Sequence, residues 1–340
     1  MNFPLGNTVL RKVPLVYRAF VAAAMLAATI GTAPLHAQAP AAWPAKTIRI
    51  VVPFPPGGQT DIVARFIADH LTKSWGQQVV VENRAGAGGT IGTDYVAKSA
   101  PDGYTLLLCT LAANAIAPSV YAKLPYDATK DFTPIMALTG TPSVIGINPA
   151  LPIKTLAEFI DYAKARPGQL TFSSPGAGVS SHLAMENLAL TAGLKMIHVP
   201  YRGSAPALNA VMAGEVSSTF DPISTMAPLA KSGKVRAIAM SGTKRSPLLP
   251  DVPTIAEVGL KGVESYAWNG LMGPAGMAQD LVAKVNRDAG VGLRSADLRD
   301  RMAALGVEIL DMGPADFANY VRAETEKWGA IARRVGAKAE

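Results

Sequence analysis

The sequence predicts two doubly wound α/β domains, each built on a mostly parallel sheet. The chain has 340 residues, which is more than one hydrophobic core usually holds. Apolar residues make up 49% of the chain and charged residues 17%, which is typical of a globular protein rather than a disordered one. Strand and helix signals alternate along the sequence, and this alternation predicts parallel strands covered by helices.

The N-terminal segment has the pattern of an export signal. Arg11, Lys12 and Arg18 form a basic start, and residues 19–30 are small and apolar. This apolar run is shorter than the ~20 residues that a membrane-spanning helix needs. We therefore expect residues 1–37 to be a signal peptide cleaved after Ala37, which places the protein in the periplasm. An uncleaved membrane anchor is the alternative.

The charge pattern argues against a nucleic-acid partner. The formal charge of +7 falls to +4 when the three basic residues of the signal segment are removed. The remaining Lys and Arg residues are scattered, with no basic helix and no interleaved aromatic residues. A modest positive charge favours anionic ligands.

The cysteine and histidine content argues against redox and metal chemistry. The only cysteine, Cys109, lies in the apolar run at 105–110, so no internal disulfide is possible and a buried core position is expected. A cysteine nucleophile needs a base, and the sequence offers no obvious partner for one. Only four histidines are present, one of them in the signal segment. We expect no cofactor and no metal.

The first run of alternating elements predicts the first domain. Its helix after residue 58 places apolar side chains on one face at helical spacing, at Ile62, Val63, Phe66, Ile67 and Leu71. The glycine-rich segment at 84–89 leads into a second helix. The predicted strands of this unit are residues 48–53, 79–81 and 105–110.

A second unit of the same kind begins near Ser143. Thr155 and Glu158 form a capping box at the start of a helix. The predicted strands of this unit are residues 170–172, 196–199 and 235–240. The C-terminal part reads as helical, with one stripe formed by Phe317, Tyr320, Val321, Trp328, Ile331 and Val335 and interrupted by Glu324.

No low-complexity linker separates the two halves, which indicates domains joined by crossing strands. We expect a discontinuous domain 1 at 46–142 plus 268–340 and a domain 2 at 143–267. The hinges are expected near 140–146 and 266–272. We expect the protein to be a monomer.

Three loops of Gly, Ser and Pro each follow a predicted strand and precede a predicted helix. They are residues 54–61, 173–182 and 200–206, and Arg202 in the third either adds a fixed charge or faces solvent. The first amides of a helix lack internal partners and carry partial positive charge, so such a helix start binds carboxylate or phosphate. Ordinary helix capping is the alternative for any single loop, but three in one α/β chain favour an anion site at the carboxyl ends of the strands.

At these loops the sequence resembles a known family. The segments at 53–61 (PFPPGGQTD), 82–92 (ENRAGAGGTIG), 100–107 (APDGYTLL) and 199–203 (VPYRG) resemble the tripartite tricarboxylate transporter receptors, also called Bug or TctC-type solute-binding proteins. The resemblance covers about residues 43–335. It implies a type II periplasmic binding-protein fold with a ligand cleft between two α/β domains, and small carboxylate ligands.

The resemblance and the loops together define the expected site. The family pattern matches Phe54, Gly57, Gly58 and Asp61 in the first loop, Gly86 and Gly88 in the glycine turn, Gly176, Ala177, Gly178 and Ser181 at the second helix start, and Asp221 as a cleft acid. Asp221 accepts from a ligand amine or a loop amide, or caps a helix. The other expected site residues are Thr110, Asn114, Ser174, Tyr201, Arg202 and Gly203.

Two enzyme classes are poorly supported. The spacing of glycines at 86–92 differs from the dinucleotide fingerprint, because the third glycine comes one position late. Ser180, Ser181 and His182 lie close in sequence, but no nucleophile elbow surrounds them, and helix neighbours do not face each other in triad geometry. A secreted hydrolase is therefore the less favoured alternative.

The expected function is capture of a small carboxylate by domain closure: a di- or tricarboxylate, an acidic amino acid or an aromatic acid. The expected protein partners are the permease subunits of a tripartite tricarboxylate transporter. A sensor that presents its closed form to a membrane signalling protein is the alternative, because both roles use the same closure.

Overall fold

Short apolar runs form the first strands of the sheet. A computed structural model describes residues 43–338, and the predicted signal peptide lies outside them. Strand β1 (Ile48–Val52) is the run IRIVV, in which every residue except Arg49 is buried. It pairs in parallel with β2 (Val79–Asn83) on one side and β3 (Thr105–Thr110) on the other. β-branched residues buried on both faces are typical of parallel strands.

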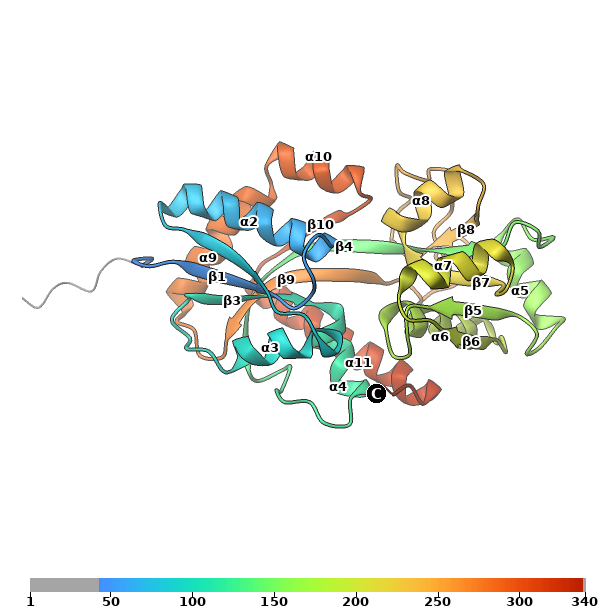
Figure 1. Ribbon diagram of the computed structural model, residues 1–340, viewed down its shortest axis with the longest axis horizontal. Helices are drawn as coiled ribbons and strands as arrows, with labels where there is room; N and C mark the ends of the chain where they lie inside the picture. The colour runs from blue at the N-terminus through green and yellow to red at the C-terminus, as the bar shows by residue number, and fades with distance from the viewer. Residues whose placement is uncertain (1–42, 339–340) are drawn as a thin grey trace, which may run out of the picture. The chain divides into compact units, whose positions relative to one another are not determined.

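The long strand β4 (Phe132–Ile147) connects two groups of strands. Its first part pairs antiparallel with β9 (Tyr266–Pro274), as far as Pro142. From Ser143 onward it pairs with β7 (Ser218–Pro222). Figure 1 shows β4 and β9 extending between the two groups. The change of partner falls within the segment predicted to contain the first hinge.

These pairings define two lobes. Lobe 1 has the strand order β2-β1-β3-β9-β4, with β10 (Glu308–Met312) antiparallel to β4. Lobe 2 contains the second part of β4, then β7, β5 (Thr171–Ser174) and β6 (Ile197–Pro200), with β8 (Arg236–Met240) also paired to β4. Backbone contacts cluster the chain from Pro44 onward as one compact unit, so the division into two mobile domains stays a prediction.

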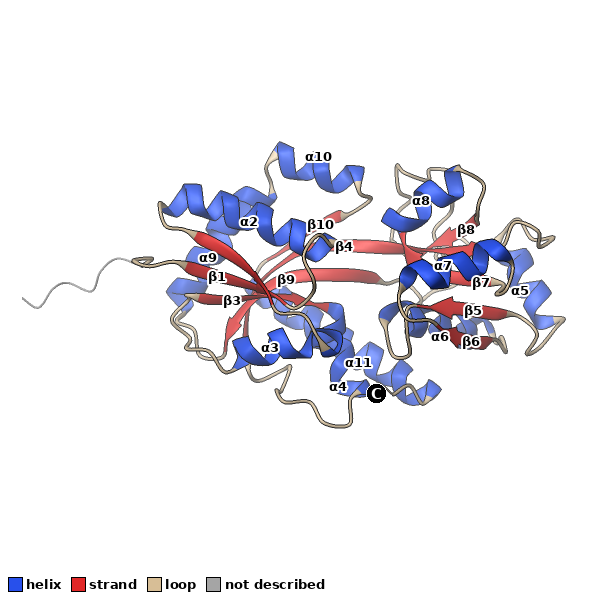
Figure 2. Cartoon of the chain, in the orientation of Figure 1, coloured by secondary structure: helices blue, strands red, loops and turns tan. Residues whose placement is uncertain are grey.

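Helices lie on both faces of the strands in each lobe (Figure 2). The helices of lobe 1 are α2 (Gln59–Trp75), α3 (Thr90–Ala97), α4 (Ala117–Val120), α9 (Gln279–Leu293), α10 (Ala296–Ala304) and α11 (Pro314–Val335), with a 3-10 turn at Ala87–Gly89 and a π-helical turn at Ala112–Ile116. Those of lobe 2 are α5 (Leu156–Lys164), α6 (Ser180–Ala192), α7 (Ser204–Ala213) and α8 (Ile223–Lys231). The predicted α/β fold class is confirmed.

The predicted capping box begins α5. The Thr155 hydroxyl accepts a hydrogen bond from the amide of Glu158 at 3.1 Å. The Glu158 carboxylate accepts from the amide of Lys154 at 2.6 Å, one residue before the usual N-cap amide. Two amides at this helix start are therefore satisfied by local side chains, so this terminus does not serve as an anion site.

The helical stripe predicted in the C-terminal part is confirmed by α11, but one strand in this part was not predicted. Strand β10 lies between α10 and α11, and it was missed because Glu308 and Asp311 break its apolar pattern. Its pairing with β4 shifts register near Asp311, which has a left-handed φ of 46°. The expectation for Cys109 was right, because its side chain is fully buried in β3. Within residues 43–338 no helix is long and apolar enough to cross a bilayer.

Candidate ligand-binding site

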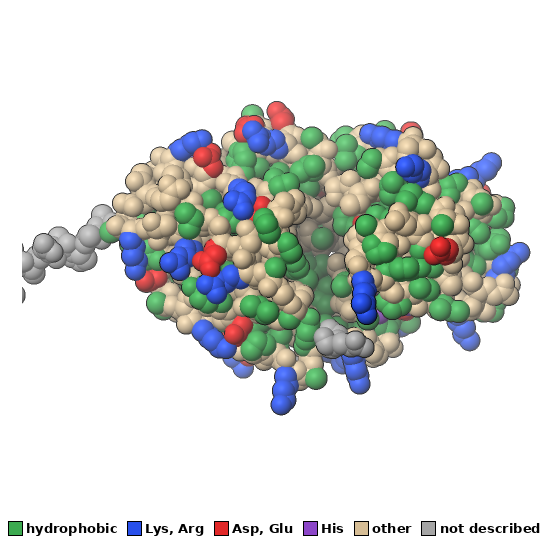
Figure 3. All heavy atoms as spheres, viewed as in Figure 1, with side chains coloured by type: hydrophobic (Ala, Val, Ile, Leu, Met, Phe, Trp, Pro, Cys, Tyr) green, Lys and Arg blue, Asp and Glu red, His purple; other side chains and the backbone are tan. Residues whose placement is uncertain are grey.

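A cavity of about 270 Å³ lies where the two lobes meet, at the first turns of α2 and α6. The space-filling view shows the surface hollowed between the lobes, with hydrophobic side chains visible in the hollow (Figure 3). The lining combines apolar and uncharged polar residues and contains no charged side chain. The lining residues are Phe54, Gln59, Thr60, Thr110, Leu111, Ala112, Val179, Ser180, Ala267, Trp268 and Asn269.

The N-terminus of α2 contributes unpaired amides to this cavity. Its N-cap, Gly58, has extended backbone (φ −76°) and provides no side-chain cap. The first helical hydrogen bond runs from the Ile62 amide to the Gly58 carbonyl at 3.0 Å. The preceding amides of Gln59 and Thr60 have no partner among the described residues. Because both residues line the cavity, the positive end of the helix dipole lies beside it.

Asp61 holds the loop that leads into α2. It is buried, and its carboxylate accepts hydrogen bonds from the Gly57 amide at 3.0 Å, from Arg65 Nε at 2.8 Å and from Asn83 Nδ2 at 2.9 Å. Burial raises the pKa of Asp61, but the hydrogen bonds from Arg65, Gly57 and Asn83 outweigh it and lower the pKa below its ordinary value. Asn83 Nδ2 also donates to the Phe54 carbonyl at 3.1 Å. Asp61 thus acts on the cavity through loop geometry and does not line it.

The glycine turn lies beneath the Phe54 side chain. Gly86, Gly88 and Gly89 all have positive φ, at 136°, 65° and 96°. A Cβ on Gly89 would lie 3.2 Å from the Phe54 ring, and one on Gly88 would lie 2.8 Å from the Tyr121 hydroxyl. The turn therefore needs glycine for both backbone conformation and space. Gly89 packs against Phe54, whereas Gly86 and Gly88 approach Ile91 and Tyr121 and do not line the cavity.

The N-terminus of α6 faces the same cavity from lobe 2. Its N-cap, Val179, has extended backbone (φ −77°) and makes no side-chain cap. The first helical hydrogen bond runs from the Leu183 amide to the Val179 carbonyl at 3.1 Å, so the Ser180 and Ser181 amides have no partner among the described residues. Val179 and Ser180 line the cavity, and Ser181 is buried behind them.

The loop before α6 is fixed by internal hydrogen bonds. The Ser174 hydroxyl donates to the Gly176 carbonyl at 2.7 Å and accepts from the Gly176 amide at 3.3 Å. The Gly178 amide donates to Nδ1 of His182 at 3.0 Å. Ala177 is exposed at the tip of the loop. Ser174, Gly176 and Gly178 therefore shape the approach to α6.

The third predicted loop lies behind the second one. The Tyr201 amide donates to the Ser174 carbonyl at 2.9 Å, and the Gly203 amide donates to the Pro175 carbonyl at 3.1 Å. Arg202 is exposed. None of these three predicted site residues lines the cavity, so the structure places only two of the three helix starts there.

Two of the predicted polar site residues differ in position, because Thr110 lines the cavity and Asp221 is buried outside its lining. Thr110 ends β3 and lines the cavity, and its amide donates to Asn114 Oδ1 at 3.1 Å. Asp221 ends β7 opposite Val144 and is only 1% exposed. One of its oxygens accepts from the Thr225 hydroxyl, while Oδ2 has no partner among the described residues. Burial raises the pKa of Asp221, and the Thr225 hydrogen bond offsets this only in part.

Sequence reasoning missed the polar floor of the cavity. Gln59 Nε2 donates to the Thr141 hydroxyl, and the Thr60 hydroxyl lies 3.5 Å from Asn269 Oδ1. Asn269 Nδ2 donates to the Thr139 hydroxyl at 3.3 Å. The isolated Asn269 in the apolar run at 266–272 was the one available signal, because a buried polar residue needs a partner.

A buried carboxylate fixes one wall of the cavity. Trp268 lines the cavity and donates its indole N–H to Glu324 Oε2 at 3.2 Å. Trp328 donates to the same oxygen at 2.9 Å, and Lys327 Nζ lies 3.4 Å from the other. The Trp268 N–H therefore bonds Glu324 of α11 and is not free to bond a ligand. Glu324, which interrupts the apolar stripe of that helix, is buried because these donors satisfy it.

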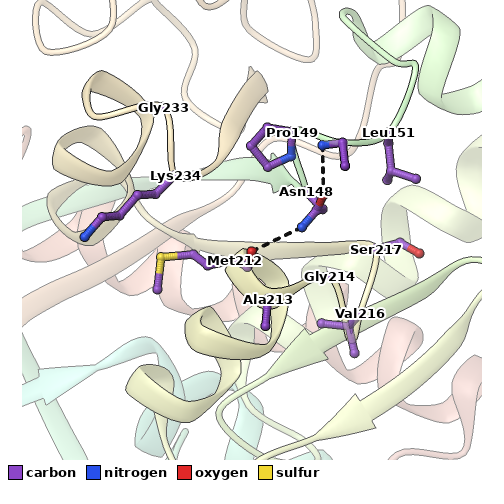
Figure 4. Close-up of a pocket in the computed structure, with 11 residues that line it drawn as sticks. Asn148, Pro149, Leu151, Met212, Ala213, Gly214, Val216, Ser217, Gly233 and Lys234 are labelled. Atoms are coloured by element: carbon purple, nitrogen blue, oxygen red, sulfur yellow. Dashed lines mark hydrogen bonds between the residues drawn. The ribbon is translucent and has the colours of Figure 1, made fainter.

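A larger cavity, of about 610 Å³, has one cationic side chain, Lys234, among the residues that line it. It lies at the C-terminal ends of α7 and α8 in lobe 2 (Figure 4). Asn148 Nδ2 donates there to the carbonyls of Val211 at 2.7 Å and Met212 at 3.3 Å. Helix C-termini present carbonyls and partial negative charge. Within residues 43–338 no cluster of three or more His, Cys, Asp or Glu side chains is placed to hold a metal.

The fold and the cavity together define a class of protein, the two-lobed solute receptor with its site at the carboxyl ends of sheet strands. Residues 63–337 match the profile of a family described as "Tripartite tricarboxylate transporter family receptor". The chain belongs to this family, whose members are solute-binding receptors.

Individual relatives resemble the chain over nearly its full length. BugT of Bordetella pertussis is 37% identical over 317 residues, covering 93% of this chain and 97% of BugT. A protein of R. palustris solved with adipate is 34% identical with a TM-score of 0.75, covering 87% of this chain and 99% of its own. MatC of Rhodopseudomonas palustris, solved with bound malate, is 36% identical with a TM-score of 0.71, covering 85% and 99%.

Proposed function

We propose that this protein binds a small organic carboxylate between the first turns of α2 and α6 and delivers it to the permease of a tripartite tricarboxylate-type transporter. The observation that carries the proposal is that two helix starts without side-chain caps, one from each lobe, line a single cavity. The adipate and malate named for two relatives are ligands of the same chemical class.

Backbone amides alone can hold such an anion. A hydrogen bond to a charged group contributes about 1.5–3 kcal/mol, and the helix dipole adds roughly 0.3–1 kcal/mol. Micromolar affinity requires about −8 kcal/mol after the costs of association. The amides of Gln59, Thr60, Ser180 and Ser181, with apolar contacts from Phe54 and Val179, are sufficient in number to reach it.

The lining also indicates the character of the ligand body. It contains neither a cationic nor an anionic side chain, and Phe54, Leu111, Val179 and Trp268 supply apolar surface. The Trp268 N–H is already occupied by Glu324. The apolar part of this lining therefore fits the hydrocarbon part of a small mono- or dicarboxylate.

The remaining predicted site residues lie around the proposed contact between the carboxylate and the amides of α2 and α6. Gly57, Gly58 and Asp61 shape the first loop, and Gly86 and Gly88 belong to the glycine turn whose third glycine, Gly89, packs against Phe54. Ser174, Gly176, Ala177, Gly178 and Ser181 shape the second loop, which is backed by Tyr201, Arg202 and Gly203. Asp221, beside the crossover of β4, is buried with one unpaired oxygen and does not line the cavity.

The proposed mechanism is closure of the two lobes. The α2 amides belong to lobe 1 and the α6 amides to lobe 2, so one carboxylate bonded to both favours the closed arrangement by its differential contacts. The strands β4 and β9 that connect the lobes are the proposed hinges. Export through residues 1–37 places the receptor in the periplasm, as for BugD, a structural relative described as a periplasmic binding protein.

A paired ligand screen tests the proposal. The thermal unfolding midpoint of the purified protein is measured with adipate, malate, succinate and benzoate, and with the uncharged amide of each acid. A ligand at one hundred times its dissociation constant stabilises the folded state by about 2.7 kcal/mol. We expect at least one acid to raise the midpoint while its amide does not. Equal effects of acid and amide would contradict recognition by unpaired amides.

A further inference from the structure

Two histidines are stacked beneath the loop that leads into α6. His182, in the first turn of α6, is 7% exposed, and His198 lies on β6. Their ring centroids are 3.7 Å apart with an interplanar angle of 13°. The Phe172 ring of β5 lies nearly parallel to both rings, with its centroid 4.9 Å from that of His198 and 6.1 Å from that of His182. His182 is buried and His198 is partly buried, and the pair lies behind the loop that leads to Val179 and Ser180.

The hydrogen bonds of His182 define its protonation state. Nδ1 accepts from the Gly178 amide at 3.0 Å, so this nitrogen carries no hydrogen. The ring hydrogen is on Nε2, which lies 3.7 Å from Glu186 Oε1. A second proton can bind only at Nδ1, the atom that accepts the Gly178 amide. Protonation of His182 therefore removes this hydrogen bond to the loop.

His198 holds the other end of the same loop. Its Nε2 lies 2.6 Å from the Ser174 hydroxyl oxygen. The single hydroxyl hydrogen of Ser174 is directed to the Gly176 carbonyl at 2.7 Å, so His198 is the donor to Ser174. The two stacked rings thus contact both ends of Ser174–Gly178, the segment that sets the position of Val179 and Ser180.

The surroundings oppose positive charge on the pair. Within residues 43–338, Glu186 is the one acid recorded against the pair, while β5 contributes Phe172 and Ser174, and β7 contributes Phe220 to the neighbouring core. Burial, then the proximity of His182, lowers the pKa of His198 to about 4, and Glu186 offsets this only in part. Two protonated rings at stacking distance repel each other.

We propose that His182 and His198 are positioning residues for the anion-binding loop of α6, and that protonation of His182 releases this loop, so that acid weakens ligand binding at this site. The predicted effect of acid on ligand affinity rests on the proposed function. The structural part of the inference, the dependence of the loop on His182, does not require a ligand.

The structural part is tested on the ligand-free protein. Proton–nitrogen correlation spectra are recorded from about pH 7.5 to about pH 4, and the Gly178 amide signal is compared with the ring signals of His182. We expect the Gly178 signal to move with the same midpoint as His182, as the hydrogen bond is lost. A Gly178 signal that stays fixed while His182 titrates overturns the proposal, whether or not any acid binds.

The functional part uses three variants and the acid with the largest stabilising effect in the screen. His182→Asn keeps an acceptor near the position of Nδ1 but does not titrate. His182→Phe keeps the ring but removes the acceptor. His70→Asn is the matched control, because this histidine lies on α2 and bonds the Asp288 carbonyl, far from the pair in the fold.

In the unchanged protein we expect affinity to fall about three- to tenfold on acidification, the effect of losing one hydrogen bond that orders the site. His70→Asn should show the same fall, whereas His182→Asn should bind normally at neutral pH with a flat pH profile. His182→Phe should bind weakly at both pH values. An equal acid response in His182→Asn and the unchanged protein overturns the proposal. If no acid binds at neutral pH, the proposed function fails, while the Gly178 titration still decides the structural part.

Discussion

Gln59 in the first turn of α2 and Ser180 in the first turn of α6 line the same cavity, although one belongs to lobe 1 and the other to lobe 2. Neither helix has a side-chain N-cap, whereas the start of α5, away from the cavity, is capped by Thr155 and Glu158. Uncapped helix starts from both lobes therefore lie where one anion can satisfy their amides.

Asp61→Asn should destabilise the first loop. Its buried carboxylate accepts from Gly57, Arg65 and Asn83, and an amide can accept at only one of its two positions. We expect the free energy of unfolding at pH 7 to fall by about 1.5–3 kcal/mol, measured by urea denaturation. Asp69→Asn, at an exposed site on the same helix, should change it by less than about 0.5 kcal/mol.

The same substitution has a defined pH dependence. Because the pKa of Asp61 is lowered in the folded state, its stabilising effect is present above the ordinary value of 3.8 and is lost as the pH falls below it. The difference in stability between Asp61→Asn and the unchanged protein should therefore shrink in acid. A difference that is constant down to about pH 3 would show that the carboxylate charge has no part in holding the loop.

Asp221→Asn should stabilise the ligand-free protein at neutral pH. Burial raises the pKa of Asp221 in the folded state, so its ionised form reduces stability above the ordinary value of 3.8, and this loss disappears as the carboxyl group is protonated in acid. The neutral amide still accepts from Thr225. We expect a gain of about 1 kcal/mol in the unfolding free energy at pH 7 that vanishes in acid. A loss of stability at pH 7 would indicate that a cation or donor pairs with this carboxylate in the free protein.

Glu324→Leu should be strongly destabilising, because it leaves the indole N–H groups of Trp268 and Trp328 buried without an acceptor. Each unsatisfied group costs about 1–3 kcal/mol. Glu324→Gln retains one acceptor and should cost less, and Glu326→Gln, at an exposed position of the same helix, should be nearly neutral. Urea denaturation and near-ultraviolet circular dichroism of the tryptophans distinguish the three. Equal stability of Glu324→Leu and Glu326→Gln would contradict this role.

Local signals were sufficient to predict β1, β2, β3, β5, β6 and β8 and the capping residues of α5, because each depends on residues within a few positions of one another. The strands β4 and β9 were expected only as crossing segments without bounds, and β7 and β10 were not predicted. The starts of β1, β2 and β3 coincide with the predicted starts. The first two helix-start loops reach the cavity because β1 and β5 each end beside it, while the third follows β6, the last strand in the order of lobe 2.

The rest of the site depends on pairing between distant segments. Trp268 and Asn269 reach the cavity because β9 pairs with both β3 and β4, and no periodicity in the sequence specifies that register. Glu324 interrupts the apolar stripe of α11, but its carboxylate accepts a hydrogen bond from the indole N–H of Trp268 on β9. The stack of His182 on His198 likewise arises from the pairing of β5 with β6.

The most direct test of the account compares Ser180→Pro with Ser180→Ala. Proline is tolerated at the first position of a helix and fits after the extended backbone of Val179, but it has no amide hydrogen to donate. Binding of the acid with the largest effect in the screen is measured by titration calorimetry, with the thermal midpoint as the check on folding. The account predicts that both variants fold and that Ser180→Pro binds about 10- to 100-fold more weakly than Ser180→Ala. Equal affinities in the two folded variants would show that the amide at the start of α6 does not hold the ligand.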